Sequence, residues 1–343
     1  SSAASDVYKR QALMAPTGRA AKRLAISSGR DADTIHKALE ASVRETGRTY
    51  FEKNEANPLG EDLIIVDEAS MLDISLFYHL LCALKDGARL ILVGDIDQLP
   101  PVGAGEPLKD LMSWGYVPIV RLKRIFRQEE GSGIVENAAL IRKGEMCVPD
   151  EAGEFRIIYA ADDEDAYRIV MDLCRELNYG NEENKMLLQV LSPMYRGVCG
   201  VDHLNESLQE MIHGEKVPDG MKFFPGDKVM QTRNDYEKGI YNGDVGTVWT
   251  ATPQKVFVRY FDKEVVYEGE ERFDLRLAYA VTVHKSQGSE YETVIFILRP
   301  SQHNMLQRNL LYTGVTRARK NTILVTAPDA LRRALAIQHT GNR

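Results

Sequence analysis

Short apolar runs, each bounded by turns and helical stretches, recur along the chain and restrict its possible folds. The clearest are Leu63–Val66, Leu90–Val93, Leu187–Leu191, Val294–Leu298 and Thr322–Thr326. Runs of this kind are typical of strands buried on both faces of a parallel sheet. Helical patterns lie between them, so the chain is predicted to be an α/β protein. In open parallel sheets, the chemistry lies in loops at the carboxyl ends of the strands.

One segment, residues 222–274, departs from this pattern. It has many β signals and few helical ones, with turn chemistry at Asn242-Gly243 and a strand pair formed by Lys255–Tyr260 and Glu264–Glu268. We expect a small SH3-like β-barrel inserted into the second of two α/β domains. The predicted domains are residues 12–120, and residues 121–221 together with 275–335.

The first eleven residues show neither strand alternation nor a capped helix, and we expect residues 1–11 to be a non-native tail. The four cysteines form no CxxC pair, which argues against a zinc site and a disulfide framework. No apolar run is long enough to cross a bilayer, so no membrane role is expected. A reducing cytoplasm is the simplest setting.

The formal net charge of -7 argues at first against a nucleic-acid partner. The basic residues are clustered, however, within residues 17–30, 121–127 and 317–320, while acids collect between Asp150 and Asp165. A basic track on an acidic body can hold a phosphate backbone. On charge alone, solvated helix faces remain the favoured interpretation.

Two adjacent carboxylates, Asp67 and Glu68, directly follow the apolar run Leu63–Val66. Such a pair is costly at a strand end unless a cation is present, and a nucleotide-bound Mg²⁺ would supply one. Asp67 would hold the metal through its water shell, and Glu68 would deprotonate an attacking water. Taken alone, the same residues are an equally reasonable helix N-terminus.

The next apolar run, Leu90–Val93, also ends in polar residues. The chain turns at Gly94 and brings Gln98 to the neighbouring strand end, where an amide could touch both a terminal phosphate and a water. A loop punctuated by Gly and Pro explains the composition but not the recurrence of polar groups at two adjacent strand ends.

These segments, with their order along the chain, resemble the motifs of RecD-like superfamily 1 DNA helicases. The resemblance rests on six segments in the family's order and a RecD-family loop, and it covers nearly all of residues 12–327. The matching segments are Ala15–Lys22 (motif Ia), Asp67–Ser70 (II), Gly94–Val102 (III), Ile125–Gln128 (IV), Ser192–Gly197 (the loop), Thr282–Glu290 (V) and Leu311–Ala318 (VI).

The resemblance implies two RecA-like domains with ATP bound between them and Mg²⁺ as cofactor. Asp67, Glu68 and Gln98 would be catalytic, with Arg127 and Arg317 as arginine fingers that neutralise charge on the transferring phosphoryl group. It further implies nucleotide-binding roles for Gly94, Asp95, Gly288 and Glu290, of which Glu290 would contact the ribose.

The resemblance also implies a track for single-stranded DNA and a duplex fork, with 5′ to 3′ translocation. The protein partners and the pathway are left open. The residues implied to contact DNA are Pro16, Thr17, Arg19, Lys22, Tyr195, Arg196, Thr282, His284 and Lys285. Motif Ia follows a strand and opens a helix, so its backbone N–H groups could hold a phosphate.

One departure from the family is the P-loop, G-x-x-x-x-G-K-[ST], which has no match in the 343 residues. We therefore expect a chain truncated before its P-loop, inactive by itself, with exposed apolar surface on Leu63–Val66 and Leu90–Val93. Two alternatives stay open: the helicase part of a conjugative relaxase, and a non-catalytic remnant that binds single-stranded DNA.

Residues 42–53 contain strand-like residues around Thr46-Gly47-Arg48 and predict a hairpin. Related helicases place a strand-separating hairpin here, so Tyr50 or Phe51 is expected to stack on the fork base pair. A simple β connection is an equal alternative. The barrel at residues 222–274 is expected to overhang the DNA channel and retain the strand.

Overall fold

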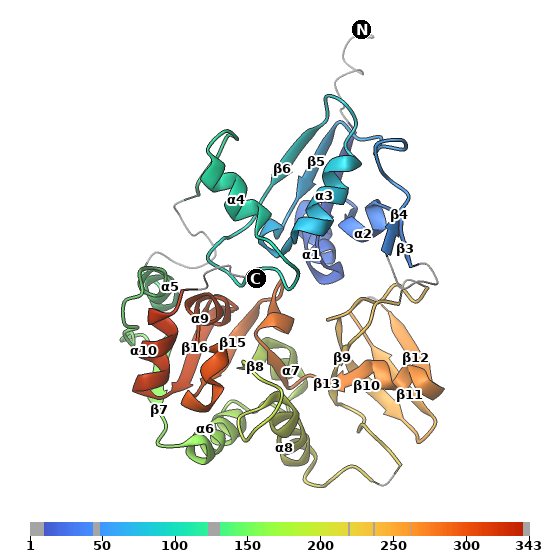
Figure 1. The fold of residues 1–343 in the computed structure, drawn as a ribbon. Helices are drawn as coiled ribbons and strands as arrows, with labels where there is room; N and C mark the ends of the chain where they lie inside the picture. The colour runs from blue at the N-terminus through green and yellow to red at the C-terminus, as the bar shows by residue number, and fades with distance from the viewer. Residues whose placement is uncertain are drawn as a thin grey trace. The chain divides into compact units, whose positions relative to one another are not determined.

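The computed structural model describes residues 10–43, 49–122, 131–218, 220–235, 237–261 and 263–338 (Figure 1). Contacts between Cα atoms divide the chain into two compact units, which meet in sequence between Arg121 and Leu122. Each unit is described below by itself.

The first unit is built on a parallel sheet of four strands in the order β2-β1-β5-β6. Its core packs Met14, Ile64 and Val66 of the sheet against the apolar side of α3, including Leu76 and Leu80. The elements are β1 (Gln11–Ala15), α1 (Gly18–Ser28), β2 (Ala32–Thr34), α2 (Ile35–Ala38), β3 (Ala41–Val43), β4 (Thr49–Phe51), β5 (Leu63–Val66), a 3₁₀ turn (Ala69–Met71), α3 (Ile74–Cys82), β6 (Arg89–Leu92) and α4 (Pro107–Trp114).

The start of the sheet corrects the predicted tail boundary at residue 11. Gln11 pairs with Leu63 in the parallel ladder, and the Arg10 carbonyl accepts hydrogen bonds from Asp62 N at 2.9 Å and Leu63 N at 3.2 Å. Arg10 and Gln11 are therefore part of the fold. The rest of the predicted tail, residues 1–9, lies outside the described residues.

The strand β6 is less buried than its sequence suggests. Ile91 in β6 and Val93 directly after it are each 45% exposed, and β6 is the last strand of the described sheet. The surface exposure predicted for Leu90–Val93 is thus present, whereas Leu63 and Ile65 of β5 are only half-buried and their neighbours Ile64 and Val66 are fully buried.

The predicted hairpin exists as the antiparallel pair β3–β4, in which Ser42 lies opposite Tyr50. Its turn, residues 44–48, lies outside the described residues. Phe51 is buried and packs against the rings of His36 and His79, at centroid distances of 5.9 and 4.5 Å. The proposal that Phe51 stacks on DNA is therefore wrong, because its ring belongs to the core, whereas Tyr50 is 36% exposed.

The second unit contains a parallel sheet of five strands in the order β14-β8-β15-β16-β7. Strand β8 and the Thr322–Thr326 part of β16 are wholly buried, as their apolar runs predict. The α/β elements are α5 (Gly133–Lys143), β7 (Phe155–Tyr159), α6 (Asp163–Glu176), α7 (Glu182–Leu187), β8 (Leu188–Ser192), α8 (Val201–His213), β14 (Ala280–Thr282), a 3₁₀ turn (His284–Ser286), β15 (Tyr291–Leu298), a 3₁₀ segment (Pro300–Met305), α9 (Arg308–Val315), β16 (Ala318–Thr326) and α10 (Pro328–Ala336).

Between α8 and β14, the chain forms an antiparallel sheet in the order β12-β11-β10-β9-β13, here called the β insertion (Figure 1). It has its own core, to which Val229, Val248, Val258 and Leu275 contribute. Its elements are β9 (Lys228–Gln231), β10 (Val245–Ala251), β11 (Lys255–Arg259), β12 (Glu264–Glu268), a 3₁₀ segment (Gly269–Asp274) and β13 (Leu275–Leu277).

The junction between the β insertion and the parallel sheet contains buried charges. Asp227, which is fully buried, accepts hydrogen bonds from the side chains of Gln209, His213 and Tyr279. Lys228 Nζ donates to the Leu188 carbonyl and to Gln189 Oε1, both at 3.0 Å. Because buried charges need such partners, this seam specifies one arrangement of the two sheets within the unit.

Candidate functional site

The carboxyl end of β5 carries the two predicted acidic residues. Asp67 N donates to the Met14 carbonyl of the neighbouring strand at 2.9 Å, and Asp67 Oδ1 accepts from Glu68 N at 2.9 Å. Glu68 has φ 52°, one of three non-glycine residues with positive φ in the described ranges. A left-handed glutamate costs about 1–2 kcal/mol and is a recurrent feature of functional turns.

The loop after β6 packs directly on this turn. A Cβ added to Gly94 would lie 2.8 Å from Ser70 N and 3.1 Å from Ala69 N, so only glycine allows this approach. Ala69 N also donates to the Val93 carbonyl at 2.8 Å. Motifs II and III are thus joined through their backbones.

Gln98 is buried within the same loop, where its backbone N–H donates to the Asp95 carbonyl at 3.2 Å. Gln98 and Ser70 line one small cavity, together with Glu106 and Lys109. The predicted residues Asp67, Glu68, Gly94, Asp95 and Gln98 therefore gather at one edge of the first sheet. Across the described ranges, no group of three or more His, Cys, Asp or Glu side chains is arranged to hold a metal ion.

Motif Ia lies at the amino terminus of α1. Thr17 caps the helix, accepting from Ala20 N at 3.3 Å, and the first turn contains no acidic residue. Pro16, Arg19 and Lys22 are half-buried on the same turns. This helix end combines the positive end of the helix dipole with cationic side chains.

Motif V lies at the carboxyl end of β14, in the second unit. Thr282 is buried, and its Oγ1 accepts from Lys285 N at 3.2 Å. Lys285 Nζ donates to Asn242 Oδ1 of the β insertion at 2.6 Å. Burial lowers the pKa of His284, so its ring is neutral near pH 7 and offers a hydrogen bond rather than a charge.

The residues Tyr195 and Arg196 lie in the loop after β8, and both are exposed. The guanidinium of Arg276, on β13, lies 6.0 Å from the Tyr195 ring centroid, within cation–π range. The carboxyl edge of the second sheet thus collects the residues predicted for DNA contact in motif V and in this loop.

The predicted arginine finger Arg317 is buried, with 1% exposure. Its Nε donates to the Thr313 carbonyl at 3.1 Å and its Nη1 to the Ser289 carbonyl at 3.2 Å. Glu290 forms an ion pair with Arg319 at 3.5 Å, and Gly288 has φ 72°. Arg127, the other predicted finger, lies outside the described residues.

Comparisons with known families match three parts of the chain. The model of an AAA domain matches residues 2–104, and the model of the ATP-dependent RecD-like DNA helicase SH3 domain matches residues 204–260. The UvrD-like helicase C-terminal domain matches residues 277–325, which contain motifs V and VI.

Comparison with curated proteins extends this likeness to the whole chain. It is 38% identical, over 330 residues, to the ATP-dependent RecD2 DNA helicase of Deinococcus radiodurans. The chain is homologous to the RecD-like DNA helicases. The alignment covers 95% of the chain and 44% of that relative. With RecBCD enzyme subunit RecD of Mycolicibacterium smegmatis, the identity is 32%, covering 97% of the chain and 65% of the relative. The chain therefore spans 44% and 65% of the lengths of these two relatives.

Solved structures agree with the fold. A Pif1 helicase at forked double-stranded DNA superposes with a TM-score of 0.56 at 22% identity, covering 94% of this chain and 83% of that one. The Pif1 helicase of Candida albicans gives 0.54 at 18%. The prediction of two RecA-like parallel sheets with an SH3-like insertion is confirmed. In the described part of the chain, no helix is both long and apolar enough to span a bilayer.

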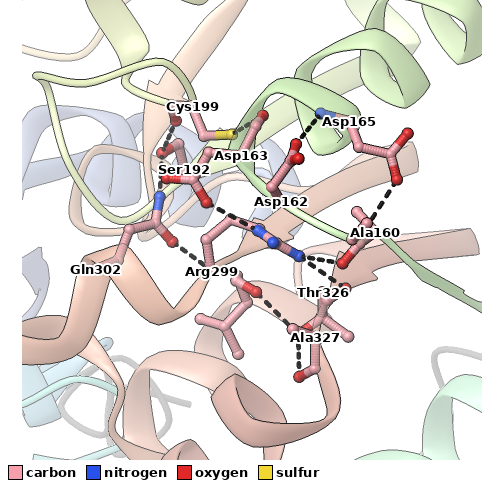
Figure 2. A network of polar contacts seen from close by, with 12 residues as sticks. Ala160, Asp162, Asp163, Asp165, Ser192, Cys199, Arg299, Gln302, Thr326 and Ala327 are labelled. Atoms are coloured by element: carbon pink, nitrogen blue, oxygen red, sulfur yellow. Dashed lines mark hydrogen bonds and ion pairs between the residues drawn. The ribbon is translucent and has the colours of Figure 1, made fainter.

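Arg299, which directly follows β15, and Gln302, in the 3₁₀ segment after it, were not predicted from the sequence. Arg299 is 2% exposed and its Nη1 donates to the carbonyls of Ala160 and Thr326, at the ends of β7 and β16 (Figure 2). An arginine that directly follows the apolar strand Val294–Leu298 was an available signal, because a charge at a buried strand end needs several partners.

Proposed function

We propose that the protein is an ATP-dependent DNA helicase that couples ATP hydrolysis to 5′ to 3′ movement on single-stranded DNA and to duplex unwinding. The observation that carries this proposal is the 38% identity over 330 residues to an ATP-dependent RecD2 DNA helicase. The polarity rests on the family resemblance.

The nucleotide chemistry is assigned to the carboxyl edge of the first sheet. Glu68 would accept a proton from the attacking water, and Gln98 would orient that water against the terminal phosphate. The left-handed backbone at Glu68 and the contact of Gly94 with Ser70 N hold these groups in one place, and positioning is a main source of rate here.

A bound Mg²⁺ would neutralise charge on the phosphates. Asp67 fits a role in its water shell, because Mg²⁺ in nucleotide sites takes few protein carboxylates and keeps most of its water and phosphate ligands. The described residues offer no larger cluster of ligands, in keeping with a metal that arrives with its nucleotide.

The second unit would supply Arg317, and residue Arg127 before it, to the transferring phosphoryl group. Arg317 Nε and Nη1 bond to the carbonyls of Thr313 and Ser289, so these bonds would be exchanged for phosphate oxygens during the reaction. Gly94, Asp95, Gly288 and Glu290 are assigned to nucleotide binding, with Glu290 at the ribose.

The single strand would lie on the phosphate-binding groups of motifs Ia and V. Thr17, Arg19 and Lys22 would bind the backbone from the first unit, with Pro16 against a base. Thr282, His284, Lys285, Tyr195 and Arg196 would do so from the second. Contacts of this kind fix position and carry no sequence information.

The experiment joins a RecD-like strand–P-loop–helix segment to the chain before Arg10, because Arg10 and Gln11 are bonded into the first sheet. ATP turnover stimulated by single-stranded DNA is expected from this fusion and not from the 343 residues, which contain no P-loop motif. Glu68→Gln should lower turnover about 10²–10⁴-fold.

Asp86→Asn, at an exposed position in the α3–β6 connection, is the control and should keep the fusion's rate. A fusion that binds ATP and single-stranded DNA but loses no activity with Glu68→Gln would contradict the assignment. Strand displacement from forks with 5′ or 3′ tails measures the polarity.

A further inference from the structure

The loop that carries Tyr195 and Arg196 is unusually tight. Val201 N donates to the Met194 carbonyl at 2.9 Å and Asp202 N to the Tyr195 carbonyl at 3.0 Å. The first turn of α8 thus binds the backbone of the loop at Met194 and Tyr195. A Cβ added to Gly200 would lie 2.5 Å from Arg196 C and from Tyr195 O. The backbone of the exposed tip therefore rests directly on Gly200.

The base of this loop is fixed by a buried hydroxyl. Ser192, the last residue of β8, is fully buried, and its Oγ donates to the Cys199 carbonyl at 2.6 Å. The Cys199 thiol donates in turn to the Asp163 carbonyl at 3.3 Å. Burial raises the pKa of this thiol to about 12, so it remains a neutral donor. The Ser192 hydroxyl thus bonds the start of the loop to Cys199, seven positions later in the chain.

The same hydroxyl is tied to the rest of the sheet. Gln302 Nε2 donates to Ser192 Oγ at 3.2 Å, while Gln302 Oε1 accepts from Arg299 N at 2.9 Å. Arg299 Nε donates to Asp163 Oδ1 at 3.1 Å. Figure 2 shows this network converging on the side chain of Arg299. The carboxyl ends of β7, β8, β15 and β16 are joined beneath the loop.

We propose that Ser192 is a positioning residue for DNA binding: it holds the Pro193–Cys199 loop so that the Arg196 guanidinium meets a phosphate of single-stranded DNA. This rests on the proposed function. A loop ordered before binding loses less conformational entropy when its side chains bind, and that difference appears as affinity. Ser192, Gln302 and Arg299 are buried, so their effect on DNA binding would pass through the exposed tip of the loop.

The test compares two buried hydroxyls at the carboxyl ends of β8 and β16, which lie on either side of β15 in the sheet. Ser192→Ala removes the loop's bond, while Thr326→Val removes the bond from Thr326 Oγ1 to the Leu298 carbonyl (2.8 Å), which does not reach the loop. Both residues are fully buried. Binding of the 343-residue chain to a fluorescent oligo(dT) is measured by anisotropy over a salt series, with thermal unfolding recorded for each variant.

We expect Ser192→Ala to weaken binding about five- to tenfold and to reduce the salt slope by about one, as Arg196→Ala should. The double variant should bind like Arg196→Ala alone, because both changes remove one contact. Thr326→Val should stay within about twofold of the parent. Gln302→Met, which removes the bridge to Ser192, provides a second variant if Ser192→Ala folds poorly.

Full additivity of the Ser192 and Arg196 changes would overturn the proposal, as would parent affinity and slope in a folded Ser192→Ala chain. If Thr326→Val weakened DNA binding as much as Ser192→Ala, the Ser192 hydroxyl would only stabilise the fold in general, and the proposal would be overturned. A parent chain that does not bind oligo(dT) would instead remove the proposed function, and the inference with it.

Discussion

The two parallel sheets differ in the chemistry of their central loops. The loops after β5 and β6 of the first sheet carry acids and an amide, in Asp67, Glu68 and Gln98, whereas the loops after β8 and β14 of the second carry Arg196 and Lys285. Both edges arise from the same topology, in which loops after parallel strands gather together. The fold therefore provides the place, and the side chains decide whether it suits a metal–nucleotide or a phosphate backbone.

The two edges are also held together differently. In the first unit, a backbone contact at Gly94 and a left-handed Glu68 lie where the loops meet, whereas the second adds to its backbone contact at Gly200 a buried side-chain network around Arg299 and Ser192. Backbone packing tolerates no added atom, while a side-chain network can be changed one bond at a time. The predictions below test this contrast.

The largest change in the free energy of unfolding is expected in the β3–β4 hairpin. This hairpin is part of the first unit, and the second unit has no predicted counterpart. Phe51→Ala should lower the free energy of unfolding by about 3 kcal/mol, because a buried ring is lost between His36 and His79. Tyr50→Ala should change it by less than about 1 kcal/mol. Urea denaturation measures both.

In the fusion with a P-loop, Tyr50→Ala should slow unwinding more than translocation on single strands. Equal slowing of the two rates would mean that the hairpin is a connection and not a wedge, and would leave DNA contact to the other motifs.

Glycines at the two edges give the next largest effect. Gly94→Ala should destabilise the chain by about 1–3 kcal/mol, since its Cβ would meet backbone at 2.8 Å, and Gly200→Ala should cost a similar amount. Gly60→Ala is the matched control: its Cβ would only approach Arg10 Nη1, at 3.7 Å. If Gly94→Ala matched this control in urea denaturation, the backbone contact between motifs II and III would be unimportant.

Much of this architecture could be predicted from the sequence. The strand β12 begins and ends as expected, and β5 does too, because short apolar runs and turn residues mark buried strands locally. The acids at Asp67 and Glu68 were found because they interrupt apolar sequence. The left-handed Glu68 was not foreseen, since glutamate has no local preference for positive φ.

Other features depended on contacts that no local pattern encodes. The exposure of Ile91 and Val93 follows from the position of β6 in the sheet, not from its composition. Phe51 and Tyr50 are adjacent and similar in the sequence, and only the burial of one ring separates their roles. The network of Arg299 joins residues up to 139 positions apart.

The salt dependence of DNA binding tests the phosphate contacts proposed for each unit. Replacing Arg19 in the first unit or Lys285 in the second by methionine should each reduce the slope of log K against log salt by about one. Lys222→Met is a control within the second unit, since Lys222 Nζ donates to the Leu275 carbonyl in the β insertion. An unchanged slope for one unit would confine phosphate binding to the other.

The smallest effect is expected from pH, and it acts on both units. Burial lowers the pKa of His36, an effect that the carboxylate of Asp73 partly opposes, and burial also lowers the pKa of His284. Each folded-state pKa lies below the ordinary value of 6.5, so between the two values the unfolded chain binds more protons. Stability should therefore be full above pH 7 and fall as pH drops below about 6.5, by at most about 1.4 kcal/mol for each pKa unit of difference.

Urea midpoints between pH 5 and 8 measure this pH dependence. His36 lies in the first unit and His284 in the second, so His36→Gln should flatten the profile of the transition that reports the first unit, and His284→Gln that of the second. A profile left unchanged by both substitutions would show that these rings are not what makes the chain sensitive to acid.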